Sequence, residues 1–446
     1  MKKDSDIVQT VVLVVFGIGI VIGVLFFSGK IKLPGDSKKV TGPTGSVVVW
    51  GVLPYGQVNS VFNGLQQKYD GLKLSYVEKK PETMQAELVD ALSSGRGPDV
   101  FMMAPGQVAE NVNRLYMVPF TAYSEGTYRA TFADIGADFL TKQGILAFPV
   151  FIDPMVMYWN RDIFSSSFLV EPPKTWDELA QKVPIITQKD DAGKINQTLV
   201  ALGTANNISH PKDLIVLKML QGGNSLVQFL DTKWIPVISE NDVLVNTLSW
   251  YTNFTNPTDP TYSWNQSLPK DREYFTAGKL GVYFGYPTEY ESIRQKNPNL
   301  NFAMAMVPQI SSTARKTDYG RVYSIGVSKI TKNLNGAVGV VSLITSKETL
   351  PLLLTGTSET YYAPARKDLL ADKPRDDANK SLIYNSAIIS KSFFDPDAPE
   401  TNRLFVNSVN QINAGTKTVS GALQSISAGF RDLTAKVKLP DVSPIP

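Results

Sequence analysis

The chain has 446 residues, of which 43% are hydrophobic and 19% charged, and its formal net charge is +3. This length favours two structural units over a single core, and the composition is that of a folded protein. The absence of cysteine excludes disulfides, thiolate catalysis and cysteine-ligated metals, and a single histidine excludes multi-histidine metal sites.

The basic residues and the one histidine carry little functional information by themselves. Lysine and arginine are not gathered into stripes, so no nucleic-acid partner is predicted. His210 stands before a proline in Asn-Ile-Ser-His-Pro-Lys, and a histidine in such a loop is expected to be exposed to solvent. One histidine would suffice for a Ser–His–Asp triad, which composition therefore leaves open. No motif calls for a bound cofactor or metal.

The N-terminal segment contains a long apolar run. Residues 7–27 carry no charge, and a helix of that length spans about 31 Å, enough to cross a bilayer core of about 30 Å. The residues after it lack the small-residue pattern of a signal-peptidase site. We therefore expect a cytoplasmic stub at 1–6, an uncleaved single-pass transmembrane anchor at 7–27 and a flexible Gly/Pro-rich tether at 28–45.

The flanks and the interior of this run bear on its orientation and association. Lys2 and Lys3 precede the run and four lysines follow it between residues 30 and 39, so flanking charge does not favour an external body. Long domains cross membranes regardless of such charges. Gly19 and Gly23 form a G-x-x-x-G pattern, which leaves a weak dimer of anchors open.

The body begins with three strand patterns, each followed by a helix pattern. The strands are expected at 47–50, 72–76 and 99–103, and the helices at 58–65, 84–92 and 108–115. This alternation predicts an open, doubly wound α/β sheet.

Two corners of that sheet are candidate ligand positions. In doubly wound sheets ligands lie beyond the carboxyl ends of the strands, which here are followed by residues 51–55 and by the Ala-Pro-Gly-Gln corner at 104–107. Turn geometry also explains Gly and Pro at such corners. Both interpretations stay open at this point.

A series of short motifs continues in a fixed order along the chain. They are G-x-G-P-D-V at 95–100, G-I-L-A-F-P at 144–149, Y-W-N-R-D-I-F at 158–164, P-P-K-T-W-D-E-L at 172–179, F-T-A-G-K at 275–279 and Y-A-P-A-R at 362–366. In this order and spacing they resemble the extracellular solute-binding proteins of ABC transporters, in the sugar-type class typified by maltose-binding protein. The resemblance covers essentially everything after the tether.

The resemblance implies an α/β, two-lobed periplasmic-binding-protein-like fold (type II), here preceded by one transmembrane helix. Lobe 1 is then expected at 46–150 plus 305–358, lobe 2 at 151–304 plus 359–438, and a disordered tail at 439–446. The body would lie outside the cytoplasm on the cell membrane. It would close on a small solute, with a saccharide favoured, and deliver it to ABC permease subunits.

Sugar-binding members of this family stack aromatic rings on sugar faces and hydrogen-bond the hydroxyls. Aromatic and polar residues near the ends of expected strands are therefore the candidate contacts, although an aromatic residue is more often part of a core. Asp153 aligns with an acidic position often used in the family, and a turn before Pro154 explains it nearly as well. The candidate ligand-binding residues are Tyr55, Gln107, Asp153, Trp264, Tyr286, Glu289, Tyr319 and Tyr361.

Three other interpretations remain open. An anchored glycosidase would need two carboxylates about 5–10 Å apart across a cleft, and no motif fixes such a pair. The adjacent Tyr361 and Tyr362 are compatible with a ferric-ion receptor, which uses paired tyrosinates. A surface scaffold with a non-binding cleft is the third. The motifs favour a non-catalytic receptor without a cofactor.

Overall fold

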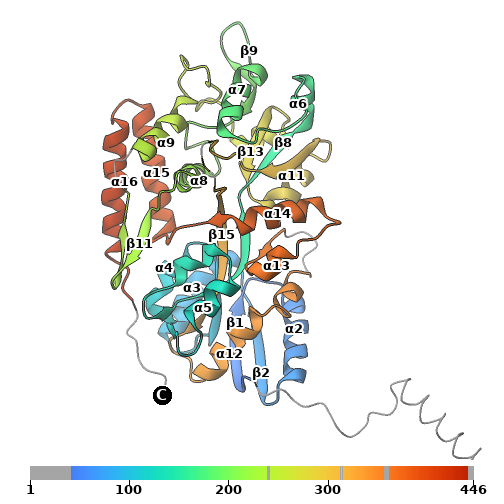
Figure 1. Cartoon of the computed structure of the whole chain (residues 1–446), viewed down its shortest axis with the longest axis vertical. Helices are drawn as coiled ribbons and strands as arrows, with labels where there is room; N and C mark the ends of the chain where they lie inside the picture. The colour runs from blue at the N-terminus through green and yellow to red at the C-terminus, as the bar shows by residue number, and fades with distance from the viewer. Residues whose placement is uncertain (1–41, 239–241, 312, 314, 356–360, 440–446) are drawn as a thin grey trace, which may run out of the picture.

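The computed structural model describes residues 42–238, 242–311, 313, 315–355 and 361–439, which form two α/β lobes, one above the other in Figure 1. The predicted stub and anchor, Gly19 and Gly23, most of the tether and the tail from residue 440 lie outside the described residues. Within the ranges that the structure describes, no helix has the length and apolar character needed to cross a membrane.

The lower lobe is built on an eight-stranded mixed sheet. Its strands are β1 (Gly45–Gly51), β2 (Leu72–Glu78), β3 (Val100–Met103), β4 (Leu115–Tyr116), β7 (Phe148–Pro154), β15 (Asp318–Ser328), β16 (Ala363–Pro364) and β17 (Ser390–Lys391). The main order is β16-β7-β15-β3-β1-β2, and β4 and β17 pair with β15. β1 is parallel to β2 and β3, whereas β15 is antiparallel to β3 and β7. A short pair, β5 (Val118–Pro119) and β6 (Gly144–Ile145), lies apart from this sheet.

The helices of the lower lobe follow the apolar spacing of the sequence. They are α2 (Tyr55–Lys68), α3 (Pro81–Ser93), α4 (Gln107–Asn111), α5 (Glu125–Thr131), α12 (Leu334–Ile344) and α13 (Lys367–Ala371). In α2 the buried residues are Val58, Phe62 and Leu65, which share one face. The predicted strand–helix alternation is confirmed. The helix after β3 is shorter than predicted, because α4 ends at Asn111 and the chain continues as a 3₁₀ turn into β4.

The upper lobe is built on a five-stranded sheet with the order β14-β8-β13-β10-β9. These strands are β8 (Val156–Asn160), β9 (Gln188–Lys189), β10 (Ile195–Val200), β13 (Leu280–Gly285) and β14 (Phe302–Met306). A separate hairpin joins β11 (Val227–Leu230) to β12 (Lys233–Pro236). Every residue of β13 is buried, as expected for a central strand covered on both faces.

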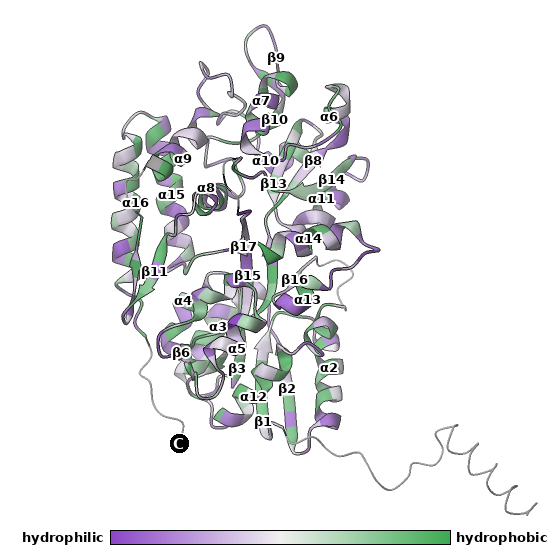
Figure 2. Cartoon of the chain, viewed as in Figure 1, coloured by the Kyte–Doolittle hydropathy of each residue, from purple (hydrophilic) through white to green (hydrophobic). Residues whose placement is uncertain are grey.

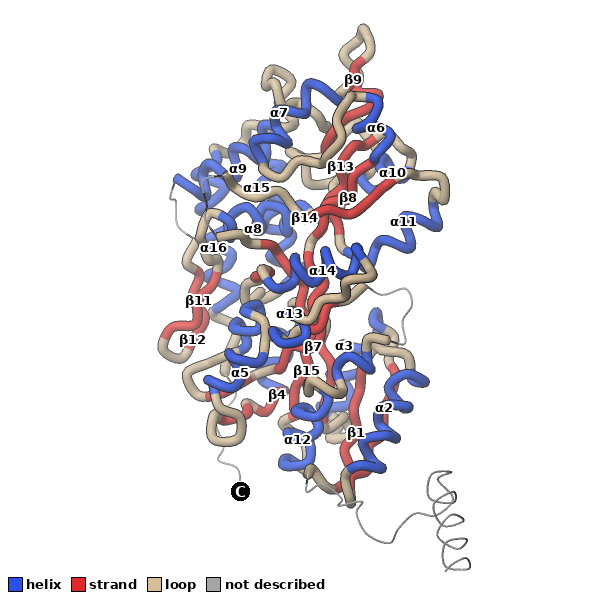
Figure 3. The backbone as a smooth tube through the Cα atoms, turned by 45° about the vertical axis from the view of Figure 1, so that its right-hand side comes forward, coloured by secondary structure: helices blue, strands red, loops and turns tan. Residues whose placement is uncertain are grey.

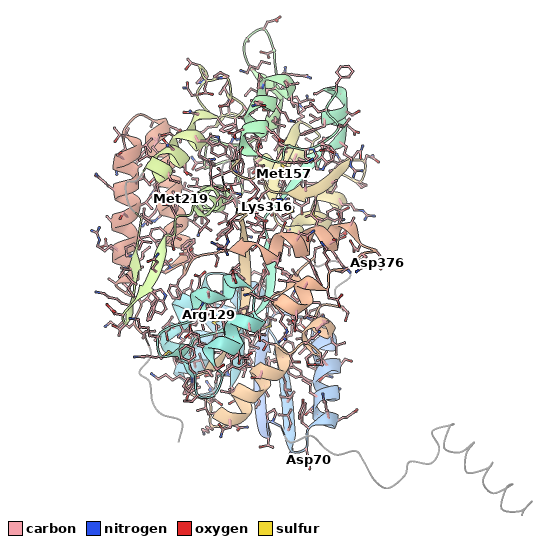
Figure 4. All side chains as sticks on the ribbon, in the orientation of Figure 1. Asp70, Arg129, Met157, Met219, Lys316 and Asp376 are labelled. Carbon is pink, nitrogen blue, oxygen red and sulfur yellow. The ribbon has the colours of Figure 1, made fainter. Side chains whose placement is uncertain are left out.

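Helices surround the upper sheet and fill the left side of the lobe in Figure 1. They are α6 (Arg161–Ser166), α7 (Trp176–Ile186), α8 (Pro211–Gln221), α9 (Asp242–Asn253), α10 (Asp271–Thr276), α11 (Tyr290–Lys296), α15 (Ala398–Asn413) and α16 (Val419–Thr434). α14 (Ala378–Ile388) lies at the junction, where it packs against β14 of the upper sheet and β7 and β16 of the lower one. Figure 2 shows hydrophobic residues along the strands in the middle of the molecule and mixed faces on the outer helices. In Figure 4, Met157 and Met219 mark the upper lobe and Arg129 and Asp70 the lower one.

Two described strand connections run between the lobes, and Figure 3 shows their strands in the middle of the molecule. A third described segment, residues 392–397, leads from β17 of the lower sheet to α15 beside the upper one. β7 of the lower sheet continues into β8 of the upper sheet with only Met155 between them, and β14 leads back to β15 through residues 307–317. The Met155 N–H donates to the Tyr319 carbonyl at 2.8 Å, which joins the two connections. The ends of β7 and β15 therefore lie where the lobes meet.

The predicted division of the chain between the lobes stays a prediction. The strand pairing gives information on one part of that division, the range predicted for lobe 2. β16 and β17 fall in the range 359–438 predicted for lobe 2, and they pair with β7 and β15 of the lower sheet. α15 and α16, later in that range, pack against α8 and α9 of the upper lobe.

Candidate functional site

A cavity of about 350 Å³ lies between the lobes. Its lower wall includes Pro105 and Gly106 from the corner after β3 and residues 319–323 of β15, and its upper wall includes the start of α8 and residues 392–395. A second cavity, of about 290 Å³, is lined by Ala104 and Gln107 of the same corner. The 104–107 corner therefore borders two cavities, at the position where this class of sheet binds ligands.

Arg321 of β15 is the centre of a hydrogen-bond network that connects the lobes. Its guanidinium donates to Asp213 Oδ2 at 3.0 Å and to His210 Nδ1 at 3.2 Å, both at the start of α8. The guanidinium carbon also lies 3.6 Å from the centre of the Tyr286 ring. The Tyr286 hydroxyl donates to the same Asp213 oxygen at 2.7 Å. These contacts form one side of the polar cavity.

The charges of this network are balanced within the protein. Burial alone would raise the pKa of Asp213, but Arg321, Lys212 and His210 outweigh burial and hold that pKa below its usual value. Asp213 is therefore an ionised acceptor for Arg321 and Tyr286.

A second ion pair lies on the upper wall of the cavity. Lys212 Nζ lies 2.7 Å from Asp395 Oδ2, and the two side chains are only 9% and 8% exposed. Lys212 also donates to the Thr401 hydroxyl, which itself donates to Asp395. Both cations that line the cavity are thus paired with a carboxylate of the same chain.

His210 is not exposed, so the expectation for this residue is wrong. Its side chain is 14% exposed, and its Nε2 lies 2.8 Å from Glu289 Oε1. The physical reason is that Pro211 is the first residue of α8, which places His210 at the helix start facing the cavity. The neighbouring Ser209 hydroxyl donates to Asp271, so it does not form the serine–histidine contact of a triad.

Four of the predicted contacts come together around Arg321. Asp153 is its partner in the β7–β15 register, Tyr286 lies fully buried under its guanidinium, and Tyr319 lines the polar cavity. Glu289 accepts from the Tyr283 hydroxyl at 2.6 Å and from the Tyr286 N–H at 3.0 Å. Tyr286 therefore packs against Arg321, and Glu289 hydrogen-bonds His210, on the side away from the cavity.

The other four lie elsewhere. Gln107 lines the second cavity, and its side-chain oxygen accepts from the Ala104 N–H at 2.9 Å. Tyr55 is 51% exposed at the start of α2, and Tyr361 packs edge-on against Tyr290. The structure does not bring Trp264 to either cavity: its side chain is fully buried and packs edge-on against Tyr274 at 5.5 Å.

Arg321, Lys212, Asp213 and Asp395 are site residues that the sequence reasoning missed. The only sequence signal for Lys212 and Asp213 was their position directly after His210 and Pro211, in the first turn of a helix, where an acidic residue such as Asp213 is favoured. Arg321 follows the candidate Tyr319 at a spacing of two, which in a strand points both side chains to the same face.

Asp153 is a buried carboxylate at the end of β7, and it does not line either cavity. Its residue is 1% exposed, and the Thr288 hydroxyl donates to Oδ2 at 2.8 Å. Its other oxygen has no hydrogen-bond partner among the residues that the structure describes. Burial raises the pKa of Asp153 to about 7, in spite of Thr288 and Arg321, which lower it.

We expect Asp153→Asn to raise the free energy of unfolding at pH 8 by about 2–4 kcal/mol and to change it little at pH 4. A carboxyl whose folded pKa is raised destabilises the folded state increasingly as the pH rises from about 4 to about 7, because the buried group must ionise. Urea unfolding at both pH values measures the difference. Asp213→Asn is the control, since its lowered pKa predicts destabilisation at pH 8. An equal effect of Asp153→Asn on stability at both pH values would contradict the raised pKa of Asp153.

Comparison with known proteins gives a family and a set of relatives. A family model described as bacterial extracellular solute-binding protein matches residues 61–380. The maltotriose-binding protein of Pyrococcus abyssi (strain GE5 / Orsay) is 21% identical over 365 residues, which are 80% of this chain and 74% of that protein. The diacetylchitobiose binding protein DasA of Streptomyces coelicolor is 25% identical over 305 residues, 66% of this chain and 65% of that protein.

Solved structures share the architecture. A cyclo/maltodextrin-binding protein complexed with maltotetraose has a TM-score of 0.70 and 18% identity, and the match covers 90% of this chain and 100% of that one. The maltose-binding periplasmic protein MalE of Listeria monocytogenes, in complex with maltose, has a TM-score of 0.66 and 17% identity and covers 88% and 98%. At these identities the likeness shows the two-lobed fold. With the family match over residues 61–380, it follows that the chain belongs to the bacterial extracellular solute-binding protein family.

Proposed function

We propose that this protein is the solute receptor of an ABC importer, and that it binds a small saccharide between its lobes without altering it. The observation that carries the proposal is the interlobe cavity beside the crossing strands, in a chain of this family. Support for a saccharide comes from relatives named for maltotriose and diacetylchitobiose and from structural neighbours with maltotetraose and maltose bound.

The chemistry of the cavity suits a neutral, hydroxylated solute. Arg321 and Lys212 are paired with Asp213 and Asp395, so the wall offers donors and acceptors with little net charge. An anionic solute would have to displace a buried carboxylate from its cation, which is unfavourable. Tyr319 adds an aromatic surface on which a sugar ring can pack.

The residues that an enzyme or an iron receptor would need are engaged otherwise. Asp213 and Asp395, the carboxylates that line the cavity, are both held in ion pairs rather than placed as an acid and a base. Tyr361 packs against Tyr290 while Tyr362 stacks on Phe151, so the two rings turn to different partners. These contacts favour binding without catalysis.

A thermal-unfolding screen of the full chain tests the proposal. A saccharide at about 100 times its dissociation constant should stabilise the folded state by about 2.7 kcal/mol, because it binds only that state. Amino acids and polyamines are the comparison compounds. Stabilisation by one of those classes and by no sugar would refute the saccharide, and release of shortened glycan during incubation would indicate an enzyme.

The proposal includes anchoring of the body to the membrane by residues 7–27. We expect the full chain to stay in the membrane fraction after an alkaline carbonate wash, because an apolar run of this length is stable only inside a bilayer. A chain without residues 1–30 should be released, and a full chain carrying Asp177→Ala, on an exposed part of α7, serves as the matched control. Release of the full chain by the wash would refute the anchor.

A further inference from the structure

The second cavity differs in chemistry from the first. It lies in the lower lobe beyond the ends of β1 and β3, and its walls are mainly apolar. Three buried methionines, Met84, Met102 and Met103, line it, and Phe151 from the crossing strand β7 adds an aromatic surface. We call this cavity of about 290 Å³ the methionine compartment.

Few polar side chains border the methionine compartment, namely those of Gln107, Tyr323 and Tyr362. The Tyr362 ring packs edge-on against the Tyr323 ring, with 5.1 Å between their centroids, and the side-chain oxygen of Gln107 accepts from the Ala104 N–H at 2.9 Å. A bare sugar ring here would lose water from most of its hydroxyls without gaining partners, at about 1–3 kcal/mol for each unpaired group. An apolar group of similar size gains free energy on leaving water. The compartment therefore discriminates against an unmodified sugar.

The methionine compartment adjoins the polar cavity at the 104–107 corner. Tyr323 lines both, and Pro105 and Gly106 face the polar side while Ala104 and Gln107 face the apolar side. One ligand can therefore contact Arg321 with one end and the methionines with the other. Unbranched methionine side chains adapt to aryl and alkyl groups of varied shape, and their sulfur packs well on aromatic rings.

We propose that the solute carries an apolar group, aryl or short alkyl, that enters the methionine compartment while its hydroxylated part lies beside Arg321. The ligand is then a glycoside conjugate rather than an unmodified oligosaccharide. This inference rests on the proposed receptor function and specifies its ligand class. The opposing chemistry of the two adjoining cavities is the observation that carries it.

The first experiment probes the compartment without any sugar. The neutral fluorescent dye N-phenyl-1-naphthylamine is titrated into the full chain, and we expect saturable binding of one dye per chain. Val52→Phe and Pro54→Phe, which add a ring at the wall and at the exposed rim, should each weaken binding at least tenfold. Val170→Phe, at a residue 88% exposed on the upper lobe, should leave binding unchanged. The inference would be overturned if the dye showed no saturable binding. It would also be overturned if the two phenylalanine variants of the compartment kept the wild-type Tm and bound the dye as tightly as the wild type.

The second experiment separates this inference from the proposed function. Calorimetry compares each free sugar of the screen, among them maltose and N-acetylglucosamine, with its 4-nitrophenyl glycoside. We expect the glycoside to bind at least tenfold more tightly, and Pro54→Phe to remove that advantage without weakening the free sugar. Equal affinity of the pair would overturn the apolar subsite while leaving sugar binding intact. Dye binding without any sugar or glycoside binding would instead refute the saccharide receptor.

Discussion

Replacement of Trp264 by alanine should lower the free energy of unfolding by about 3–5 kcal/mol, the range for deletion of a large aromatic side chain from a core. The ring is fully buried and packs edge-on against Tyr274, and the backbone N–H of Trp264 donates to the Phe254 carbonyl at 3.1 Å. Deleting the indole would leave a cavity in the upper lobe, and the hydrogen-bonded backbone around Trp264 could not move to fill it. Chemical denaturation of the wild type and the variant measures the loss.

The same variant tests whether Trp264 contacts the ligand, which stays a prediction from the sequence. A ligand contact would give weaker solute binding with little change in stability, whereas a core ring gives the reverse. Trp50 provides a matched control, because its half-buried ring is covered by the Lys79 ammonium at 3.9 Å and Trp50→Ala should be clearly less destabilising. Unchanged stability of Trp264→Ala would move this ring out of the core.

Local patterns predicted the architecture well because they depend on neighbours in the sequence. The burial of Val58, Phe62 and Leu65 in α2 follows from their spacing alone, and so does the strand–helix alternation of the lower lobe. The Thr175–Glu178 spacing is likewise that of a helix cap, and the Thr175 hydroxyl accepts from the Glu178 N–H at 3.1 Å at the start of α7. The Glu178 carboxylate accepts from the N–H of Lys174, one residue before the Thr175 N–H that a capping box would use.

The site was less predictable because its contacts join distant parts of the chain. Asp213 meets Arg321 across 108 residues, and Lys212 meets Asp395 across 183. Aromatic residues in irregular segments gave no indication of whether they face a cavity or a core: Tyr286 lies under Arg321 and Trp264 lies inside the upper lobe. Only the packing of the lobes distinguishes the two cases.

Lys212→Met should destabilise the protein by about 3–5 kcal/mol, because it leaves the Asp395 carboxylate buried without its cation. Only two neutral donors would then remain for that carboxylate, the Thr401 hydroxyl at 2.9 Å and the Asp397 N–H at 3.3 Å. Lys142→Met is the matched control, since Lys142 pairs with Asp231 at the surface, where the side chains are 62% and 90% exposed. We expect no measurable change for that variant.

The double variant Lys212→Met/Asp395→Leu should recover most of the lost stability, since removing both charges also removes their desolvation. Denaturant unfolding of the wild type, both single variants and the double variant forms a complete cycle. A double variant whose loss of stability equals the sum of the two single losses would contradict this explanation of the ion pair.

The double variant also tests whether the pair contributes to ligand binding. Because Lys212 and Asp395 line the polar cavity, we expect the double variant to bind the solute at least tenfold more weakly than the wild type, even though its stability is recovered. Recovered stability together with weakened binding would mean that the intact ion pair adds little net stability to the fold and contributes to ligand recognition.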